Sequence, residues 1–270
     1  MIRVGLIGCG NIGSFIAHYI DHSKKFRLTS VFDTRQESIE KILPTLKHTP
    51  IIASNIRMLL TEADIIVEAA SQQAVRAYGR EILTAGKSLL IMSVGALADE
   101  RLFIALKQKA EQNKCFIYLP SGAICGIDGV KAASAGVIQD VTLTTTKPPT
   151  AMQGIPYLTK KGIDVNHLRK PTVVYSGTAA QASRLFPRNI NVSTIIGLSG
   201  IGLEKTKVRI VVDPAIRDNI HEVNLTGDCG EIHIKLRNEP SPENPKTSYL
   251  ACLSAVKTLE EIGNRVRIGT

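Results

Sequence analysis

Three glycines near the start of the chain have the spacing of a nucleotide-binding turn. Gly8, Gly10 and Gly13 follow an apolar stretch and precede an amphipathic helical pattern, and Asp33 ends the next apolar stretch. In such a motif the first glycine makes a tight turn, the second lets the backbone approach a pyrophosphate, and the third allows close packing of helix on strand. The helix start offers N–H groups and partial positive charge to phosphates. The alternative is a glycine-rich turn used only for packing. The predicted cofactor contacts in this turn are Gly8, Gly10, Asn11, Ile12 and Gly13.

The residues that follow the second apolar stretch bear on which dinucleotide binds. A carboxylate at Asp33 accepts hydrogen bonds from the 2′-hydroxyl of the adenosine ribose in NAD and repels the 2′-phosphate of NADP. Arg35 lies two residues later, and an arginine at that place can accommodate the phosphate. We therefore expect both NAD and NADP to be used, with Asp33 and Arg35 as binding residues.

Two histidines fall on stretches with strand-like alternation. His221 shares a face with Val223 and Leu225, so it is predicted to point toward the apolar side of its strand. His233 alternates with isoleucines and is predicted to point to solvent. Histidine suits acid–base chemistry near neutral pH. From alternation alone, His221 is either a catalytic base or a hydrogen-bonded core residue.

No other set of side chains predicts a metal site or a nucleophile. The six histidines lack H-E-x-x-H and H-x-x-E-H spacing, and the chain has no G-x-S-x-G or G-x-x-x-x-G-K-[ST] motif. The five cysteines are scattered, odd in number and without C-x-x-C spacing. This pattern favours reduced thiols over disulfides or zinc. We expect no metal and a cytoplasmic protein.

The glycine motif opens a region in which apolar strands alternate with helical stretches. Strands are predicted at 3–7, 28–32, 51–53, 64–69, 88–92 and 115–118, and helices at 12–20, 36–42, 57–60, 74–84 and 99–112. Strands with little alternation suit a parallel sheet covered on both faces. The predicted fold is a doubly wound Rossmann sheet of order 3-2-1-4-5-6, with the ligand at the carboxyl ends of its strands. Residues 1–120 are thus expected to form a dinucleotide-binding α/β domain.

The pattern changes after residue 120. Further strands are predicted at 137–146, 172–175, 207–212, 221–226 and 231–236, and helices at 179–186 and 192–203. The segment Gly227–Gly230 is a tight-turn signal, so the last two strands are expected to form an antiparallel hairpin. Residues 121–244 are predicted to form a catalytic and dimerisation α+β domain, with a mixed or antiparallel sheet and helices on one face.

The end of the chain predicts one more helix. Asn244 followed by Pro245 resembles an N-cap followed by a first-turn proline. The segment 245–270 is expected to carry this helix back against the first domain. We also expect an apolar sheet face or edge of the second domain to be covered in a homodimer, formed mainly through residues 124–240.

Composition limits the classes of partner. The 270 residues carry a net charge of +9, yet aromatic residues make up only 4% and tryptophan is absent. Nucleic acid is therefore not an expected partner. Two explanations of the positive charge remain. A basic surface would attract an anionic cofactor and a small anionic substrate, or the charge only keeps the surface soluble and has no role in binding.

No apolar run reaches the roughly 18–20 residues that span a bilayer, and a strand begins directly after Met1. Neither a membrane segment nor a cleaved signal is therefore expected.

Longer stretches of the chain match the motifs of one known family. They are Gly8–Gly13, Leu119–Asp128, Lys170-Pro171, Gly177–Ala179, Phe186–Val192, Val211–Pro214 leading to His221, and Asn244–Ser248. Together they resemble the L-aspartate dehydrogenases of archaeal and bacterial type, over essentially the whole chain. The P-S-G-A-I and F-P-R-N-I-N-V stretches are more specific than the glycine motif. The resemblance implies NAD(P)-dependent oxidative deamination of L-aspartate to oxaloacetate and ammonia through iminosuccinate, an intermediate that links the family to quinolinate and NAD biosynthesis.

The resemblance also implies roles for single residues. In the family, residues matching Ala123 and Asn189 contact the nicotinamide cofactor, and a histidine matching His221 is the active-site residue. His221 is then expected to be a general base, which deprotonates the substrate ammonium or activates the water that attacks the imine. The two substrate carboxylates need cationic or N–H partners. Candidate substrate-binding residues are Arg188, Lys147 and Asn191.

Two other functions remain compatible with the first half of the chain. Another two-domain reductase, of the homoserine or dihydrodipicolinate type, would share the nucleotide-binding half but lack the P-S-G-A-I and F-P-R-N-I-N-V stretches. A non-catalytic NAD(P) sensor would bind the cofactor and convert no substrate.

Overall fold

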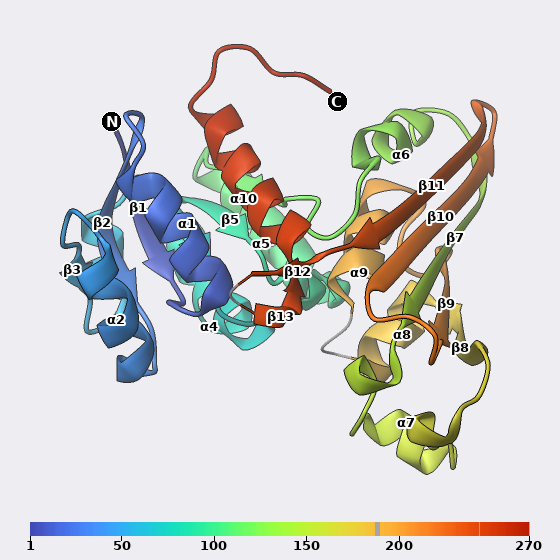
Figure 1. Ribbon diagram of the computed structural model, residues 1–270. Helices are drawn as coiled ribbons and strands as arrows, with labels where there is room; N and C mark the ends of the chain where they lie inside the picture. The colour runs from blue at the N-terminus through green and yellow to red at the C-terminus, as the bar shows by residue number, and fades with distance from the viewer. Residues whose placement is uncertain (187–189, 243, 270) are drawn as a thin grey trace. The chain divides into compact units, whose positions relative to one another are not determined.

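The chain folds into two compact units, each built around its own sheet (Figure 1). The structure is a computed structural model that describes residues 1–186, 190–242 and 244–269. The first unit comprises residues 1–120 and 251–267. The second comprises residues 121–250 and the end of the chain from residue 268.

The first unit contains a parallel sheet of order β3-β2-β1-β4-β5-β6. Its strands are β1 (Ile2–Ile7), β2 (Phe26–Phe32), β3 (Ile51–Ile52), β4 (Ile65–Glu68), β5 (Ser88–Ile91) and β6 (Ile117–Tyr118). The predicted strand order is confirmed. The order reverses between β1 and β4, which is where an open sheet of this kind binds its ligand.

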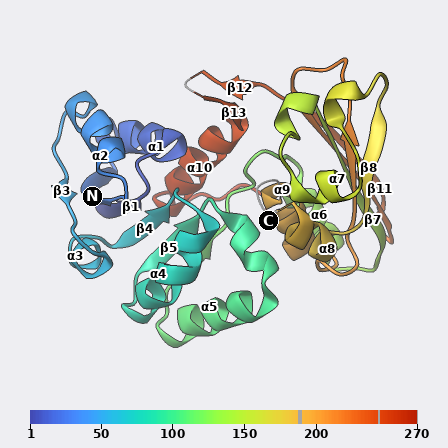
Figure 2. The ribbon, with the colours of Figure 1, turned by 90° about the horizontal axis from the view of Figure 1, so that it is seen from below.

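Helices cover both faces of this sheet (Figure 2). They are α1 (Asn11–Asp21), α2 (Gln36–Ile42), α3 (Ile56–Thr61), α4 (Gln72–Thr84), α5 (Glu100–Gln112) and α10 (Tyr249–Ile262). The short 3₁₀ turn η2 (Val94–Ala98) follows β5. On one face, Val4 and Leu6 of β1 pack with Ile16 of α1 and Leu259 of α10 in one buried cluster. This apolar core fixes α1 and the turn before it.

The last helix packs on the first unit, as predicted. Ala255 and Leu259 are fully buried in the cluster that includes Ile16, and the Tyr19 hydroxyl donates to Glu260 Oε1 at 2.9 Å. Helix α10 therefore returns to the first sheet although the whole second unit lies between them in sequence.

The predicted start of this helix is wrong. Asn244–Ser248 form strand β13, which pairs antiparallel with β12 (Pro240–Ser241). The Tyr249 N–H donates to Glu239 O at 3.0 Å, which closes the hairpin, and the helix begins only at Tyr249. The local Asn-Pro signal is overridden because the hairpin commits the backbone of this segment to a partner strand.

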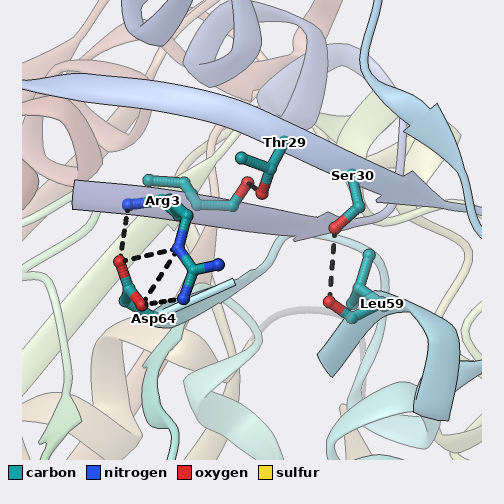
Figure 3. A network of polar contacts seen from close by, with 6 residues as sticks. Arg3, Thr29, Ser30, Leu59 and Asp64 are labelled. Carbon is teal, nitrogen blue, oxygen red and sulfur yellow. Dashed lines mark hydrogen bonds and ion pairs between the residues drawn. The ribbon is translucent and has the colours of Figure 1, made fainter. Parts of the chain in front are cut away.

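Two contacts tie the first sheet to its connections (Figure 3). The Arg3 guanidinium donates to Asp64 at 2.7 Å, and the Arg3 N–H donates to the same carboxylate at 3.0 Å. Ser30 of β2 is fully buried, and its hydroxyl donates to Leu59 O of α3 at 3.3 Å. Solvent screens the exposed Arg3 pair, so it contributes little to stability, whereas the Ser30 bond satisfies a polar group that has no access to water.

The second unit contains a mixed sheet of order β11-β10-β7-β9-β8. Its strands are β7 (Ile138–Lys147), β8 (Thr172–Thr178), β9 (Lys207–Val212), β10 (Asn219–Gly227) and β11 (Gly230–Asn238). Strands β7 and β9 run parallel, and the other neighbours run antiparallel. The predicted hairpin closes where Gly227 pairs with Gly230.

Helices α6 (Ile127–Ala133), α8 (Ala179–Leu185) and α9 (Asn191–Ser199) lie on one face of this sheet (Figure 1). Helix α8 begins with a capping box formed by Thr178 and Gln181, which satisfies two backbone donors at its start. Two short helices, α6 and α7 (Pro156–Lys160), were not predicted. Gly126 and Gly129 at α6, and Gly154 with Pro156 at α7, are typical of turns and obscure the helical pattern.

The other face of the second sheet is largely polar, with one apolar row formed by Ile220, Val211 and the exposed Val173. In β7, Val141, Leu143 and Thr145 are buried, whereas Thr142 and Thr144 are partly exposed on the opposite face. Neighbouring positions on this face include Glu222 and Asn224 of β10, Arg209 of β9 and Lys235 of β11. Polar residues thus predominate on this face, and the covering of a sheet face or edge in a homodimer stays a prediction. In the described parts of the chain, no helix is long and apolar enough to cross a membrane.

Candidate functional site

The glycine turn after β1 leaves room for a diphosphate. Gly8 has φ +94°, and a Cβ there would lie 2.7 Å from Ala69 O. A Cβ at Gly13 would lie 1.9 Å from Gly8 O, so only glycine allows α1 to start this close to the turn. Around Gly10 the nearest atom to a Cβ would be Arg35 Nη2, at 3.7 Å. The N-cap residue of α1 is Gly10, which has no side chain to cap the helix, and a helix start of this kind is suited to an anion.

Asp33 lies at the end of β2, beside this turn. Its carboxylate accepts the Cys9 N–H at 2.7 Å and the Arg35 N–H at 2.8 Å. Arg35 Nε lies 3.8 Å from the carboxylate, and the Arg35 side chain is 71% exposed while that of Asp33 is 7% exposed. Burial, helped by the Asp33 charge, raises the pKa of the Cys9 thiol to about 12. Cys9 is therefore a protonated packing residue, and Asp33 with Arg35 forms the polar edge of the turn.

His221 is buried on β10, on the face predicted from alternation. It is 5% exposed and lies directly opposite Thr145 of β7. His221 Nδ1 and Thr145 Oγ1 share a hydrogen bond of 3.0 Å. Burial, with a smaller effect of the Lys147 charge, lowers the pKa of His221 to about 3. At neutral pH the imidazole is therefore uncharged and able to accept a proton.

Lys147 ends β7, two residues beyond Thr145 and on the same side of the strand. The residue is only partly exposed, and burial lowers the pKa of its ammonium group to about 8. Thr145, Lys147 and Ser193 border a cavity of about 10 Å³, room for one water molecule. The β7–β10 pairing thus places a neutral base and a nearby cation together.

The P-S-G-A turn at the start of the second unit is held from β11. Asn238 is 4% exposed, and its Nδ2 donates to Ala123 O at 2.9 Å. Asn238 Oδ1 accepts the Ser248 hydroxyl at 2.7 Å. The turn itself contains Gly122 at φ +69°, so both the glycine and the asparagine fix where the Ala123 backbone lies.

The structure brings some of the predicted residues together and leaves others apart. Gly8, Gly10, Asn11, Ile12, Gly13, Asp33 and Arg35 belong to one edge of the first unit, and His221, Lys147, Ala123 and Asn191 belong to the second. Asn191 is the exposed first residue of α9. Arg188 and Asn189 lie outside the described residues. His233 is exposed and bonded to Asn224 Oδ1 at 2.7 Å, as its place on the solvent face predicted.

Sequence reasoning missed two buried residues of this site. Thr145 was not singled out because a threonine in a threonine-rich strand carries no local sign that it faces a histidine on another strand. Asn238 was missed because its partner Ala123 is 115 residues away, and because Ser248 ends a strand where the sequence predicted a helix. Among the described residues, no three histidines, cysteines or acids come together in a way that could hold a metal ion.

Family models match both halves of the chain. Residues 128–262 match the model described as aspartate dehydrogenase, C-terminal. Residues 8–120 match the model described as homoserine dehydrogenase, NAD binding domain. The first unit is therefore similar to the NAD binding domain of homoserine dehydrogenase, and the match to aspartate dehydrogenase covers most of the second unit.

Full-length relatives and a solved structure agree with the second match. The L-aspartate dehydrogenase of Methanosarcina barkeri is 44% identical, with all of both chains covered. That of Nitrosopumilus maritimus is 41% identical over the same extent. The crystal structure of aspartate dehydrogenase from Thermotoga maritima has a TM-score of 0.79 at 29% identity and covers both chains completely. A scyllo-inositol dehydrogenase from Lactobacillus casei, at 14% identity and a TM-score of 0.58, covering 97% of this chain and 86% of its own, shares the fold.

Proposed function

Because the chain belongs to the aspartate dehydrogenase family, we propose that it catalyses the NAD(P)-dependent oxidative deamination of L-aspartate to oxaloacetate and ammonia through iminosuccinate. The observation that carries this proposal is the match of residues 128–262, which separates this family from other reductases with a similar first domain. A bound pyridine nucleotide would supply the hydride acceptor for the substrate Cα–H.

The glycine turn, Asp33 and Arg35 are proposed to hold the cofactor. The N–H groups at the start of α1 would bind the diphosphate, and Gly10 leaves the space for it. The Asp33 carboxylate would accept from the adenosine ribose, while the exposed Arg35 guanidinium would pair with the 2′-phosphate of NADP. Ala123 and Asn189 are proposed to contact the nicotinamide nucleotide.

His221 is proposed to be the general base. For His221 Nε2 to accept a proton, its Nδ1–H must donate to Thr145 Oγ1, and the observed 3.0 Å contact permits this tautomer. The pKa of about 3 makes the ring a weak base before substrate binds. A substrate carboxylate beside Lys147 would cancel part of the charge that depresses the pKa of His221, and so strengthen the base when substrate is present.

Lys147, Arg188 and Asn191 are proposed to bind the substrate. Two carboxylates distinguish aspartate from most amino acids, and they require cationic or N–H partners. Lys147 is favoured among them because its ammonium lies close enough to His221 to affect the pKa of the imidazole. Through iminosuccinate the enzyme would feed NAD biosynthesis, and we propose that it acts as a homodimer in the cytoplasm.

A substrate panel tests the proposed activity. Purified enzyme with NAD or NADP is mixed with L-aspartate, D-aspartate, L-glutamate, L-malate or L-homoserine, and absorbance at 340 nm is followed. Formation of NADH or NADPH with L-aspartate, together with stoichiometric ammonia, is the expected result. Reduction with homoserine but not aspartate would point to the homoserine type of reductase. Cofactor binding with no turnover of any substrate would point to a sensor.

A further inference from the structure

Glu68 is a buried carboxylate at the cofactor edge of the first sheet. It is the last residue of β4 and is 1% exposed, although the three residues before it in the strand are apolar. Burial raises the pKa of its carboxyl group, while hydrogen bonds from its neighbours oppose that rise. Burying a carboxylate destabilises the folded protein unless its oxygens accept hydrogen bonds. The groups that donate to Glu68 therefore indicate its structural role.

Two loops donate to this single carboxylate. Glu68 Oε1 accepts the Ala70 N–H and the Ser71 N–H, each at 2.8 Å. It also accepts the Ser93 hydroxyl at 2.9 Å, while Oε2 accepts the Ser93 N–H at 3.0 Å. Ala70 and Ser71 follow β4, and Ser71 caps α4. Ser93 follows β5 and precedes η2. The carboxylate therefore joins the two loops that extend from neighbouring strands.

The glycine turn rests against the segment that Glu68 holds. A Cβ on Gly8 would lie 2.7 Å from Ala69 O and 2.8 Å from Ala70 Cα. The Ala69 N–H in turn donates to Ile7 O at 2.8 Å. This packing leaves no slack where the loop after β4 leaves the sheet, so Glu68 fixes the direction in which that loop continues.

The position of Glu68 in the strand order identifies which half of the cofactor it serves. In a sheet of order 3-2-1-4-5-6, each half of the sheet receives one nucleotide of the dinucleotide. Asp33 marks the adenosine half, at the end of β2, so the ends of β4 and β5 face the other nucleotide. We propose that Glu68 is a positioning residue that shapes the loops after β4 and β5 for the nicotinamide half of the cofactor. This inference rests on the family's dinucleotide cofactor and not on the reaction with aspartate.

Glu68→Gln tests the proposal, because it keeps the size of the side chain but turns one acceptor oxygen into a donor. NADH binding is measured from its fluorescence, and AMP, which contains only the adenosine half, is measured by calorimetry. We expect the Kd for NADH to rise about 10-fold, because the loops after β4 and β5 lose part of the contact that orders them before the cofactor binds, with the Kd for AMP unchanged. Ser93→Ala removes only the hydroxyl donor and is expected to act in the same direction but less.

Ser30→Ala is the control for a purely structural effect. Ser30 is fully buried in the same sheet and donates to Leu59 O (Figure 3), so its loss should lower the Tm without changing either Kd. Unchanged NADH binding in Glu68→Gln, or equal weakening of NADH and AMP, would overturn the proposal. If Glu68→Gln does not fold, unchanged NADH binding in Ser93→Ala overturns it. None of these measurements requires turnover, so an enzyme inactive toward aspartate would leave the result interpretable.

Discussion

Burial and a neighbouring cation decide the proton state of His221. Burial is the larger cause and the Lys147 charge the smaller, and together they lower its pKa from 6.5 to about 3. The ring is therefore neutral throughout the physiological range, and its cross-strand bond with Thr145 orients it. A histidine in this state can take a proton from the substrate or from water without first losing one of its own.

If His221 is the general base, His221→Ala should lower kcat for aspartate by about 10²–10⁴-fold, the usual effect of losing a positioned acid–base group. NADH binding should change little, because the predicted cofactor residues around Gly8 and Asp33 belong to the first unit. His233→Ala, on the exposed side of the hairpin, is the matched control and should resemble the wild type. A folded His221→Ala enzyme with normal kcat and a lower Tm would show that the histidine is only a core residue.

Lys147→Met should separate binding from stability. Burial disfavours the charged form of Lys147 and lowers the pKa of its ammonium group from 10.5 to about 8. Below pH 8 the folded protein therefore holds a charged group that burial destabilises. The substitution should raise the free energy of unfolding by about 1–3 kcal/mol at pH 7, a gain that fades between pH 8 and 10.5. The KM for aspartate should rise strongly. In the wild type, the KM should increase above pH 8 as Lys147 loses its charge, and a flat profile would exclude it as a carboxylate partner.

Arg35→Ala should change cofactor preference. The guanidinium is exposed beside Asp33 and close to Gly10, where it can pair with the 2′-phosphate that distinguishes NADP from NAD. We expect the Kd for NADP to increase about 10-fold, corresponding to about 1.4 kcal/mol, and the Kd for NAD to change less. Equal losses for both cofactors, measured by titration, would show that Arg35 does not bind the 2′-phosphate.

At the scale of elements, helix α10 packs in the first unit although the residues directly before it in sequence belong to the second unit. It completes the core of the first unit through Ala255 and Leu259. Leu259→Ala should therefore lower the free energy of unfolding by about 2–5 kcal/mol, the cost of a cavity in a packed core. Leu253→Ala, on the same helix but 40% exposed, should cost within about 0.5 kcal/mol. Denaturant titration of both variants measures the difference, and equal effects would contradict the placement of α10.

At the scale of the whole molecule, the polar face of the second sheet bears on assembly. Thr144 lies near the middle of β7 on that face. If the homodimer forms through this sheet, Thr144→Lys should place like charges opposite each other across the two-fold axis and shift the mass by light scattering from dimer to monomer. Glu100→Lys, exposed at the start of α5 in the first unit, is the control for added positive charge and should remain dimeric. A wild-type monomer at micromolar concentration would contradict the dimer itself.

The sequence by itself predicted the features that depend on local pattern. The glycine turn, the Rossmann strand order, the β10–β11 hairpin and the inward face of His221 all follow from residue spacing, because turns, strand alternation and helix periods are properties of neighbouring residues. The positive φ at Gly8 and the close contact at Gly13 agree with the roles given to those glycines.

Only the tertiary structure decided the features that depend on distant partners. Thr145 faces His221 from 76 residues away, and Glu68 meets Ser93 from the neighbouring strand. The backbone of Asn244–Ser248 joins a hairpin against its own helix-start signal. Buried polar groups such as Thr145 and Glu68 form hydrogen bonds with groups far along the chain, and only the fold places those partners beside them. In Asn244–Ser248, backbone pairing with a neighbouring strand outweighs the local helix-start signal.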